Sequence, residues 1–309
     1  MNARSVAGEA CATADTPRER AVENQMRIAY QGEPGAFSEA AARQLSADAE
    51  PLACKAFEDV FDAVEGERVA YGVLPIENSI GGSIHRNYDL LLERDLPIVG
   101  EVELPVIHHL LALPGTNLAG LKRVYSHPQG LAQCERFLRT LAGVEIIASY
   151  DTAGSAKMIA DGQLTDAAAI ASARAGEVFG LVSLAASIQD FDDNVTRFLM
   201  VGRTPVRNAV ADKTSIVFAL PNEPGSLFKA LSVFALRGID LTKLESRPIP
   251  GRPWEYLFYA DLAAAADELP CTRAIAHLGE FAPMLRTLGS YARWKTHEGW
   301  LPDPFEVVS

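Results

Sequence analysis

The segment MRIAYQGEPGAFSEAAARQL at residues 26–45 decides the fold of the first part of the chain. An apolar run, MRIAY, is followed by a short loop with two glycines and then by AFSEAAARQL, which has helical character. Short apolar runs that alternate with helical segments are typical of strands joined by helices. The segment therefore predicts an α/β fold that begins at Met26.

The same alternation continues along the chain, with further apolar runs at 71–76, 121–126, 144–150 and 168–172 and a helical segment at 155–164. The stretch from Leu96 to Leu113 has the pattern of one or two long strands. We expect it to carry the chain from one α/β lobe to another. A cleft between two lobes is a usual place for a small-molecule site.

A second domain is predicted after TPVRNAVAD at 204–212, where a proline and small or polar residues interrupt the pattern. The remaining chain reads as strand 213–220, helix 226–237, strands 241–248 and 255–262, helix 272–281 and strand 285–291. This βαββαβ order is ferredoxin-like. Within the first helix, Leu227, Leu231 and Phe234 have the spacing of an inward stripe.

The predicted organisation is therefore a disordered lead-in at 1–25, a two-lobed α/β domain at 26–203, a linker at 204–212, a ferredoxin-like domain at 213–292 and a tail at 293–309. The composition of the chain, 48% hydrophobic and 22% charged, is that of an ordinary globular protein.

Charge and cysteine content exclude several classes of function. The formal net charge of -12 gives no electrostatic reason to expect nucleic acid as a partner. The sequence has no apolar run of about 18 residues, so we expect no membrane association. The four cysteines have no C-x-x-C pair, and the N-terminus lacks the apolar core of a signal peptide. A reducing cytoplasm is the expected location.

The segment QDFDDNVTRF at 189–198 carries the most informative chemistry. It presents Thr196 and Arg197 at the start of an apolar run. An arginine pairs bidentately with a carboxylate, and the neighbouring hydroxyl is able to donate a proton to a leaving oxygen. The same three letters, T-R-F, also fit an ordinary strand start.

Four other loops carry polar and small residues after predicted strands: YQGEPG at 30–35, PIENSIGGS at 75–83, YSHPQGLAQC at 125–134 and YDTAGSAKM at 150–158. In the last of these, Asp151 or Thr152 fits the start of a helix, whose free N–H groups suit an anion. Each loop also fits a simple turn or helix cap. No G-K-[ST] completes a phosphate loop.

A metal site is not indicated. His108 and His109 are adjacent on a predicted strand and point to opposite faces, so they do not chelate together. The inventory of hydroxyls, amides, Arg197 and helix ends suits the binding of a small anion whose own structure drives the reaction.

Taken as a set, YQGEPGAFSEAA, GVLPIENSIGGSI, YSHPQ with AQC, DTAGSA and NVTRF resemble the prephenate and arogenate dehydratases, in the order and spacing of that family. The resemblance covers the chain from Arg27 to Tyr291. It implies a catalytic domain of two α/β lobes, like a periplasmic binding protein, over 26–203. An ACT domain over 213–292 is implied as well.

The resemblance also assigns site residues. Thr196 matches the presumed proton donor to the C4 hydroxyl of the substrate ring, and Arg197 would hold a substrate carboxylate. Phe198 completes the motif. The polar positions that match the pocket of the family are Asn78, Ser79, Ser126, Gln133, Thr152 and Ser155. Loss of carbon dioxide and water makes an aromatic ring, so neither cofactor nor metal is expected.

In the second domain, Glu245, Ser246, Arg247 and Pro248 reproduce the E-S-R-P motif of the family, which is associated with phenylalanine bound between two ACT domains. The companion G-A-L-V motif stands here as Gly225, Ser226, Leu227 and Phe228. The resemblance thus implies phenylalanine as an effector and a homodimer or homotetramer. Glu245 and Arg247 also fit an ordinary surface ion pair.

The choice of substrate stays open between prephenate, placed first, and arogenate, with dual specificity between them. GGSIHRNYDLLL at 81–92 is similar to plant arogenate dehydratases, although bacterial relatives with prephenate activity share much of it. A different class of function, a non-catalytic amino-acid receptor joined to a sensor domain, is disfavoured by Thr196 and Arg197.

Overall fold

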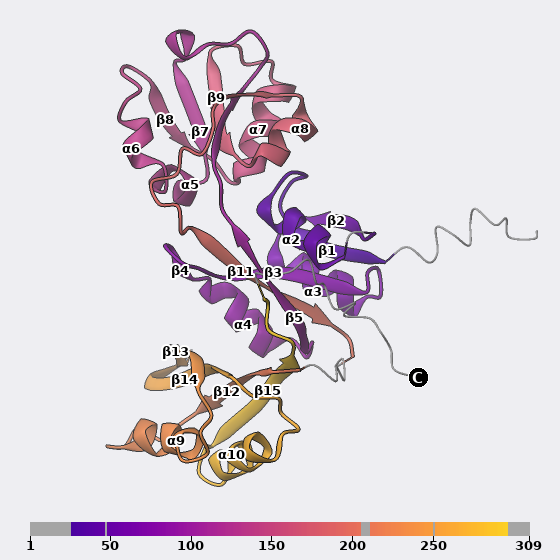
Figure 1. The fold of residues 1–309 in the computed structure, drawn as a ribbon, viewed down its shortest axis with the longest axis vertical. Helices are drawn as coiled ribbons and strands as arrows, with labels where there is room; N and C mark the ends of the chain where they lie inside the picture. Colours follow the sequence, from indigo (N-terminus) through magenta and orange to yellow (C-terminus); the bar gives the residue numbers. More distant parts are fainter. Residues whose placement is uncertain (1–25, 47, 205–210, 250, 296–309) are drawn as a thin grey trace, which may run out of the picture.

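The computed structural model describes residues 26–46, 48–204, 211–249 and 251–295, and the chain is stacked in three tiers (Figure 1). The first lobe is the middle tier, the second lobe lies above it and the C-terminal domain lies below. The predicted lead-in at 1–25, most of the predicted linker and the tail from residue 296 onward lie outside the described residues.

The first lobe is built on a six-stranded sheet of order β2-β1-β3-β11-β5, with β4 paired to β3. Its strands are β1 (Arg27–Gln31), β2 (Glu50–Cys54), β3 (Tyr71–Asn78), β4 (Gly82–Ser83), β5 (Ile98–Pro105) and β11 (Val195–Gly202). Its helices are α2 (Phe37–Leu45), α3 (Phe57–Glu65) and α4 (His85–Glu93). The late strand β11 runs antiparallel to both of its neighbours, β3 and β5.

The second lobe has a five-stranded sheet of order β10-β6-β9-β7-β8. Its strands are β6 (His109–Ala112), β7 (Arg123–Ser126), β8 (Glu145–Ala148), β9 (Ala167–Ala171) and β10 (Val182–Ala185). Its helices are η1 (Leu118–Gly120), α5 (Pro128–Ala132), α6 (Glu135–Leu138), α7 (Thr152–Asp161) and α8 (Ala173–Phe179). The central strand β9 is buried along its whole length, as expected for a strand covered on both faces.

The chain passes between the lobes twice, from β5 to β6 and from β10 back to β11 (Figure 1). The first passage lies within the predicted stretch from Leu96 to Leu113, which is confirmed as two strands in two different sheets. The second passage ends at Val195, directly before Thr196. Both passages therefore lie beside the cleft between the lobes.

The C-terminal domain has the predicted βαββαβ order, with a four-stranded sheet of order β13-β14-β12-β15. Its elements are β12 (Lys213–Ala219), α9 (Ser226–Ala235), β13 (Leu241–Ile249), β14 (Arg252–Leu262), α10 (Leu269–Gly279) and β15 (Met284–Tyr291). The predicted stripe on α9 is confirmed only at Phe234, because Leu231 is half-buried and Leu227 is exposed. The buried face runs through Ala230, Val233 and Phe234, whereas Leu227 is 36% exposed.

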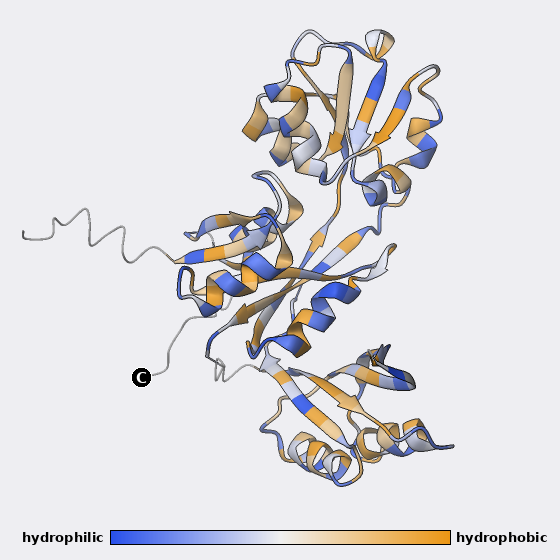
Figure 2. Cartoon of the chain, turned by 180° about the vertical axis from the view of Figure 1, so that it is seen from behind, coloured by the Kyte–Doolittle hydropathy of each residue, from blue (hydrophilic) through white to orange (hydrophobic). Residues whose placement is uncertain are grey.

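The first lobe and the C-terminal domain share one hydrophobic core. Phe61 and Leu74 of the first lobe belong to the same buried cluster as Val217 and Tyr259 of the C-terminal domain. In Figure 2 hydrophobic and hydrophilic residues alternate along the strands as well as the helices. The shared core makes these two tiers one packed unit.

Two close contacts hold that unit together. A Cβ atom on Gly289 of β15 would lie only 2.1 Å from the carbonyl oxygen of Ile98, so the backbones approach more closely than any side chain permits. Arg286 donates to the carbonyls of Leu91 and Arg94 at 3.0 and 2.8 Å, and so caps the C-terminal end of α4.

Candidate active site

A cavity of about 450 Å³ lies between the two lobes. Residues from both lobes and from the first passage line it, and none of the lining residues is a lysine or an arginine. They are Gln31, Ala36, Phe37, Ser38, Phe57, Pro75, Asn78, Ile84, Val106, His108, His127, Gln129, Gly130, Gln133, Tyr150, Asp151, Thr152, Thr196 and Phe198. A cavity of this size suits a small organic molecule.

Thr196 lies in the wall of this cavity, next to Asn78. The two residues are direct cross-strand neighbours on β11 and β3. Asn78 Nδ2 donates to Thr196 Oγ1 at 3.0 Å and to Asn194 Oδ1 at 2.7 Å. Within the described residues, no acceptor is found for the hydroxyl hydrogen of Thr196. Because its oxygen accepts from Asn78, that hydrogen is available to a ligand in the cavity.

The orientation of the Asn78 amide is set by backbone donors. The amides of Ile80 and Gly81 donate to Asn78 Oδ1 at 3.1 and 2.7 Å. Gln133 Nε2 donates to the same oxygen at 3.3 Å, and Gln133 Oε1 lies 2.9 Å from His108 Nε2. A continuous buried chain of polar side chains thus runs from His108 through Gln133 and Asn78 to Thr196. We call it the polar chain.

The helix N-termini that line the cavity include those of α2 and α7. Phe37 and Ser38 form the first turn of α2, and Thr152 is the first residue of α7; all three line the cavity. Asp151 caps α7 by accepting from Ala153 N at 2.8 Å. The N–H groups at such helix ends attract anions. The cavity therefore offers partial positive charge without a charged side chain.

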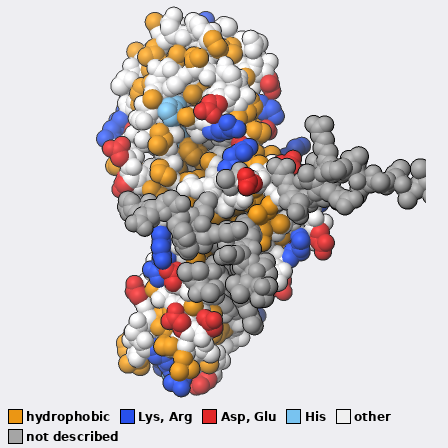
Figure 3. Space-filling model, turned by 45° about the vertical axis from the view of Figure 1, so that its right-hand side comes forward, with side chains coloured by type: hydrophobic (Ala, Val, Ile, Leu, Met, Phe, Trp, Pro, Cys, Tyr) orange, Lys and Arg blue, Asp and Glu red, His pale blue; other side chains and the backbone are white. Residues whose placement is uncertain are grey.

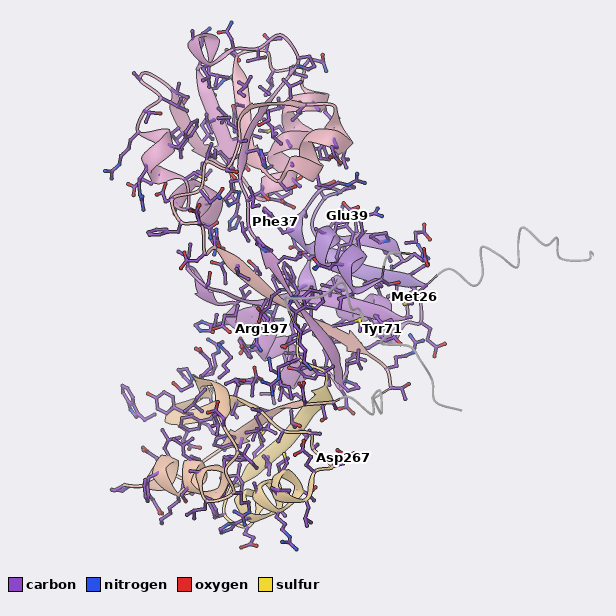
Figure 4. The ribbon with its side chains drawn as sticks, in the orientation of Figure 1. Met26, Phe37, Glu39, Tyr71, Arg197 and Asp267 are labelled. Carbon is purple, nitrogen blue, oxygen red and sulfur yellow. The ribbon has the colours of Figure 1, made fainter. Side chains whose placement is uncertain are left out.

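Arg197 corrects one prediction from the sequence. Since side chains alternate along a strand, Arg197 points to the face of the sheet opposite Thr196. It pairs with Asp261 at 2.6 Å and with Glu101 at 3.3 Å, and its side chain is only 12% exposed. Figure 4 shows Phe37 at the junction of the lobes and Arg197 farther toward the C-terminal domain. Arg197 is thus not placed to hold a carboxylate in this cavity.

The pKa of Arg197 reflects this buried ion pair. Burial alone lowers the pKa, but the charges of Asp261 and Glu101 and the hydrogen bond to Asp261 raise it overall. Burial alone raises the pKa of Asp261, but Arg197, the hydrogen bond from Ser215 and the charge of Lys213 together lower it overall. Lys213 completes the network through a contact of 2.6 Å with Glu101. The network spans the boundary between the first lobe and the C-terminal domain.

The remaining predicted pocket residues divide into two groups. Asn78, Gln133, Thr152, Thr196 and Phe198 line the cavity. Ser79, Ser126 and Ser155 are not among its lining residues, and each of their hydroxyls donates to a backbone carbonyl. These bonds run to Asp193 O at 2.7 Å, to Ile170 O at 2.7 Å and to Asp151 O at 2.7 Å, respectively.

The predicted effector residues lie in two different places. Ser226 and Leu227, beside Gly225, line a pocket of about 130 Å³ in the C-terminal domain. Glu245 and Arg247 instead contact the first lobe. Ser83 Oγ donates to Glu245 at 2.8 Å, and Arg247 donates to Asp89 at 2.6 Å. The alternation along β13 leaves Ser246 exposed on the other face.

Large apolar side chains are exposed on the C-terminal domain. Phe228 of α9 and Trp254 of β14 are each 76% exposed, and Leu236, directly after α9, is 81% exposed. Trp254 also lines the small pocket. On the face drawn in Figure 3, positive and negative side chains are interspersed among hydrophobic ones.

The two lobes also touch at the rim of the cleft. Lys157 of α7 pairs with Glu33 of the first lobe at 2.9 Å. Asp151 accepts from the amide of Glu33 at 3.2 Å, and Ser172 donates to the carbonyl of Gly35 at 2.6 Å. These contacts hold the lobes in their present separation.

Two features of the site were not predicted from the sequence. His108 lines the cavity, and its only signal is the alternation along the strand, which turns it away from His109. Glu101 and Asp261 gave no signal, because their partners are distant in the sequence. Among the described residues, no group of three metal-binding side chains is found, and no helix is long and apolar enough to cross a membrane.

Family models match most of the chain. One described as prephenate dehydratase matches residues 28–206, and one described as ACT domain matches residues 214–270. "Arogenate dehydratase/prephenate dehydratase 2, chloroplastic" of Arabidopsis thaliana is 52% identical over 87% of this chain and 73% of its own length. "Arogenate dehydratase 2" of Petunia hybrida is 51% identical over 87% and 72%, respectively.

Solved structures agree with the fold. Prephenate dehydratase from Arthrobacter aurescens, in complex with L-Phe, is 32% identical with a TM-score of 0.80 and covers 87% of this chain and 90% of that one. GqqA, described as a novel type of quorum quenching acylase, is 34% identical with a TM-score of 0.80 and covers 87% and 98%.

Proposed function

The chain belongs to the prephenate dehydratase family, and on that premise we propose that it converts prephenate to phenylpyruvate, and arogenate to phenylalanine, by decarboxylating dehydration. The observation that carries this proposal is the hydroxyl of Thr196. Its oxygen accepts from Asn78 at 3.0 Å, and its hydrogen is left for a ligand in the cavity.

In the proposed reaction Thr196 is the general acid. The bond from the ring to its carboxylate breaks, and its electron pair enters the ring. The bond between C4 and the hydroxyl oxygen breaks as Thr196 Oγ1 donates a proton. Carbon dioxide and water leave, the ring becomes aromatic, and Thr196 regains its proton from solvent. Because the product is aromatic, positioning and a well-placed acid are sufficient assistance.

The substrate carboxylates would be held by the N-terminal ends of α2 and α7. Phe37, Ser38 and Thr152 belong to the first turns of these helices and line the cavity. Backbone N–H groups at such positions bind carboxylates without a cationic side chain. Arg197 has a positioning role in this proposal, because its ion pairs hold strand β11 directly beside Thr196.

Acceptance of both substrates is supported by the names of the relatives. The Arabidopsis relative is named for both activities and the Petunia relative for arogenate alone. The two substrates differ only at the side-chain carbon, which carries a keto group in prephenate and an ammonium group in arogenate. We propose that this protein accepts both prephenate and arogenate.

Phenylalanine is the proposed effector of the ACT domain, and inhibition its proposed effect. Support comes from the Arthrobacter structure, which is in complex with L-Phe. In this chain Ser226, Leu227 and Trp254 line a pocket, and Phe228 and Trp254 of the same domain are exposed apolar side chains. Burial of such side chains against a second copy would give the homodimer, or homotetramer, that an effector site between subunits requires.

A reducing cytoplasm is the proposed location, although several plant relatives are named chloroplastic. The free cysteines Cys54, Cys134 and Cys271 are buried. Burial raises the pKa of Cys134 to about 12, so that its thiol stays protonated and unreactive. Fractionation of the source cells with an antibody against the protein tests the location.

The decisive experiment measures kcat/KM of the purified full chain on prephenate and arogenate. We expect turnover of both, with values within about tenfold of each other. Thr196→Ala should lower kcat by about 100-fold or more with little change in substrate binding, whereas Thr196→Ser should retain most activity. Absence of turnover on either substrate would refute the proposed function.

A further inference from the structure

His108 is a buried residue of the cavity wall that the proposed reaction does not use. It is 1% exposed, and it precedes strand β6 in the first passage between the lobes. Its ring packs edge-on against Phe37, with ring centroids 5.6 Å apart. Both residues line the cavity between the lobes. A titratable ring in this place has either a structural role or a ligand.

The hydrogen-bond network fixes which nitrogen of His108 carries the proton. Asn78 Oδ1 is an acceptor, because the amides of Ile80 and Gly81 donate to it. Gln133 therefore presents its Nε2 to Asn78 and its Oε1 to His108. Since Gln133 Oε1 accepts only, His108 Nε2 must donate the hydrogen across the 2.9 Å contact.

The other ring nitrogen, Nδ1, is then an acceptor with a free lone pair. Burial lowers the pKa of His108, while the contact with Gln133 opposes this effect more weakly, so the ring is neutral at neutral pH. Nδ1 is buried and has no hydrogen-bond partner among the described residues. A buried acceptor without a partner is costly, and native proteins rarely leave one in place without a function.

We propose that His108 Nδ1 accepts a hydrogen bond from the substrate, which makes His108 a further substrate-binding residue of the cavity. The donor is an O–H or N–H hydrogen of the ligand. Prephenate supplies one candidate, the C4 hydroxyl, and arogenate supplies that hydroxyl and its ammonium group. This inference rests on the proposed function for the identity of the substrate.

The polar chain explains how this contact is kept accurate. Gln133 holds Nε2 of the ring, and the same Gln133 is bonded to Asn78, which in turn bonds Thr196. The acceptor on His108 and the acid on Thr196 are therefore fixed by one network. A substrate hydroxyl that donates to His108 Nδ1 presents its oxygen lone pairs for protonation by Thr196.

Two substitutions separate the two nitrogens. His108→Gln places an amide near the position of Nε2, so that the contact with Gln133 is kept and the acceptor at Nδ1 is lost. His108→Asn places its oxygen near Nδ1 and gives up the contact with Gln133. We expect kcat/KM to fall by about 10- to 100-fold in His108→Gln and by less than about threefold in His108→Asn. His109→Asn, on the opposite face, is the matched control.

The two substrates identify the donor. An equal loss on prephenate and arogenate in His108→Gln assigns the contact to the C4 hydroxyl, and a loss confined to arogenate assigns it to the ammonium group. Either result supports the proposal. Activity that is retained in His108→Gln and lost in His108→Asn would show a structural role only and overturn it. No change in either variant overturns it as well.

A second measurement covers the case in which both variants lose activity or fold poorly. In Thr196→Ala protein labelled with ¹⁵N-histidine, addition of prephenate or arogenate should shift the His108 Nδ1 resonance toward the value of a hydrogen-bonded acceptor and leave Nε2 protonated. An unchanged Nδ1 resonance at saturating substrate overturns the proposal. The proposed function itself is judged separately, by turnover of the wild-type protein.

Discussion

Arg197 Nη1 donates to Asp261 Oδ2 at 2.6 Å, across the boundary between strand β11 of the catalytic domain and strand β14 of the ACT domain. Both side chains are almost fully buried, at 12% and 9% exposure. The residue before Arg197 is the proposed general acid. A single peptide unit therefore separates the ion pair between the domains from the proposed chemistry.

Asp261→Ala should destabilise the protein by about 3 to 5 kcal/mol, because it leaves the buried charge of Arg197 without its closest partner. We also expect a lower kcat, since β11 loses an anchor beside Thr196. Urea unfolding and steady-state kinetics measure the two effects. Glu255→Gln removes the exposed pair with Arg252 and should change stability by only about 0 to 1 kcal/mol. Equal effects of the two variants would contradict this account.

Asn78→Asp should lower kcat by about 100-fold. The new carboxylate has nearly the same shape, but it is unable to donate to Thr196 and would instead accept the proton that the substrate needs. Asn117→Asp is the control, because Asn117 only caps the short helix η1 by accepting from Gly120 at 2.9 Å. If Asn78→Asp kept wild-type kcat, Asn78 would not orient the hydroxyl of Thr196.

Arg247→Ala and Asp89→Asn should weaken inhibition by phenylalanine to a similar extent, about fivefold or more in the inhibitory concentration. Each change removes the contact of 2.6 Å between the ACT domain and helix α4. The double variant should show no further loss, since both changes break the same contact. Weakened inhibition in Arg247→Ala alone would instead indicate that Arg247 contacts the effector, as the sequence motif suggested.

Lys157→Met should raise KM by about two- to fivefold with little change in kcat. The substitution removes the ion pair with Glu33 at the rim of the cleft, which is worth at most about 1 kcal/mol. Arg174→Met breaks the Arg174–Glu177 pair within α8 of the same lobe and serves as control. A change in kcat rather than in KM would argue against a role in closing the lobes over the substrate.

The unfolding free energy should rise with pH just below pH 6.5 and flatten above it. Burial lowers the pKa of His108, and of the partly exposed His109, from the ordinary value of 6.5. Between the lowered pKa and 6.5, the unfolded state binds a proton that the folded state does not, so stability increases as pH rises. Denaturant titrations at several pH values check this. His108→Asn should flatten the slope.

The sequence predicted the fold and the chemical centre of the site more accurately than the individual contacts. Strand and helix patterns placed the βαββαβ domain and the passage from Leu96 to Leu113 close to their observed bounds. Thr196 and Asn78 were found because both follow recognisable motifs. Arg197 was misplaced, although the alternation already applied to His108 and His109 would have turned it away from the cavity.

Other contacts cannot be predicted from a single sequence, because they join residues that are far apart in the chain. The hydroxyl of Ser126 bonds Ile170, 44 residues away, and Arg247 bonds Asp89, 158 residues away. Such partners depend on which strands become neighbours. The pairing of β7 with β9 decides the first of these contacts, and an apolar run in the sequence does not indicate which strand it will pair with.

The late position of β11 in the chain has a consequence for biosynthesis. The ribosome releases β3 and β5 long before Val195, and until then the gap between these two strands stays open with unpaired edges. The second lobe, by contrast, has all of its strands by Ala185. We therefore expect nascent chains to fold the second lobe first and to keep the first lobe vulnerable to aggregation and to chaperone capture until residue 202 has emerged.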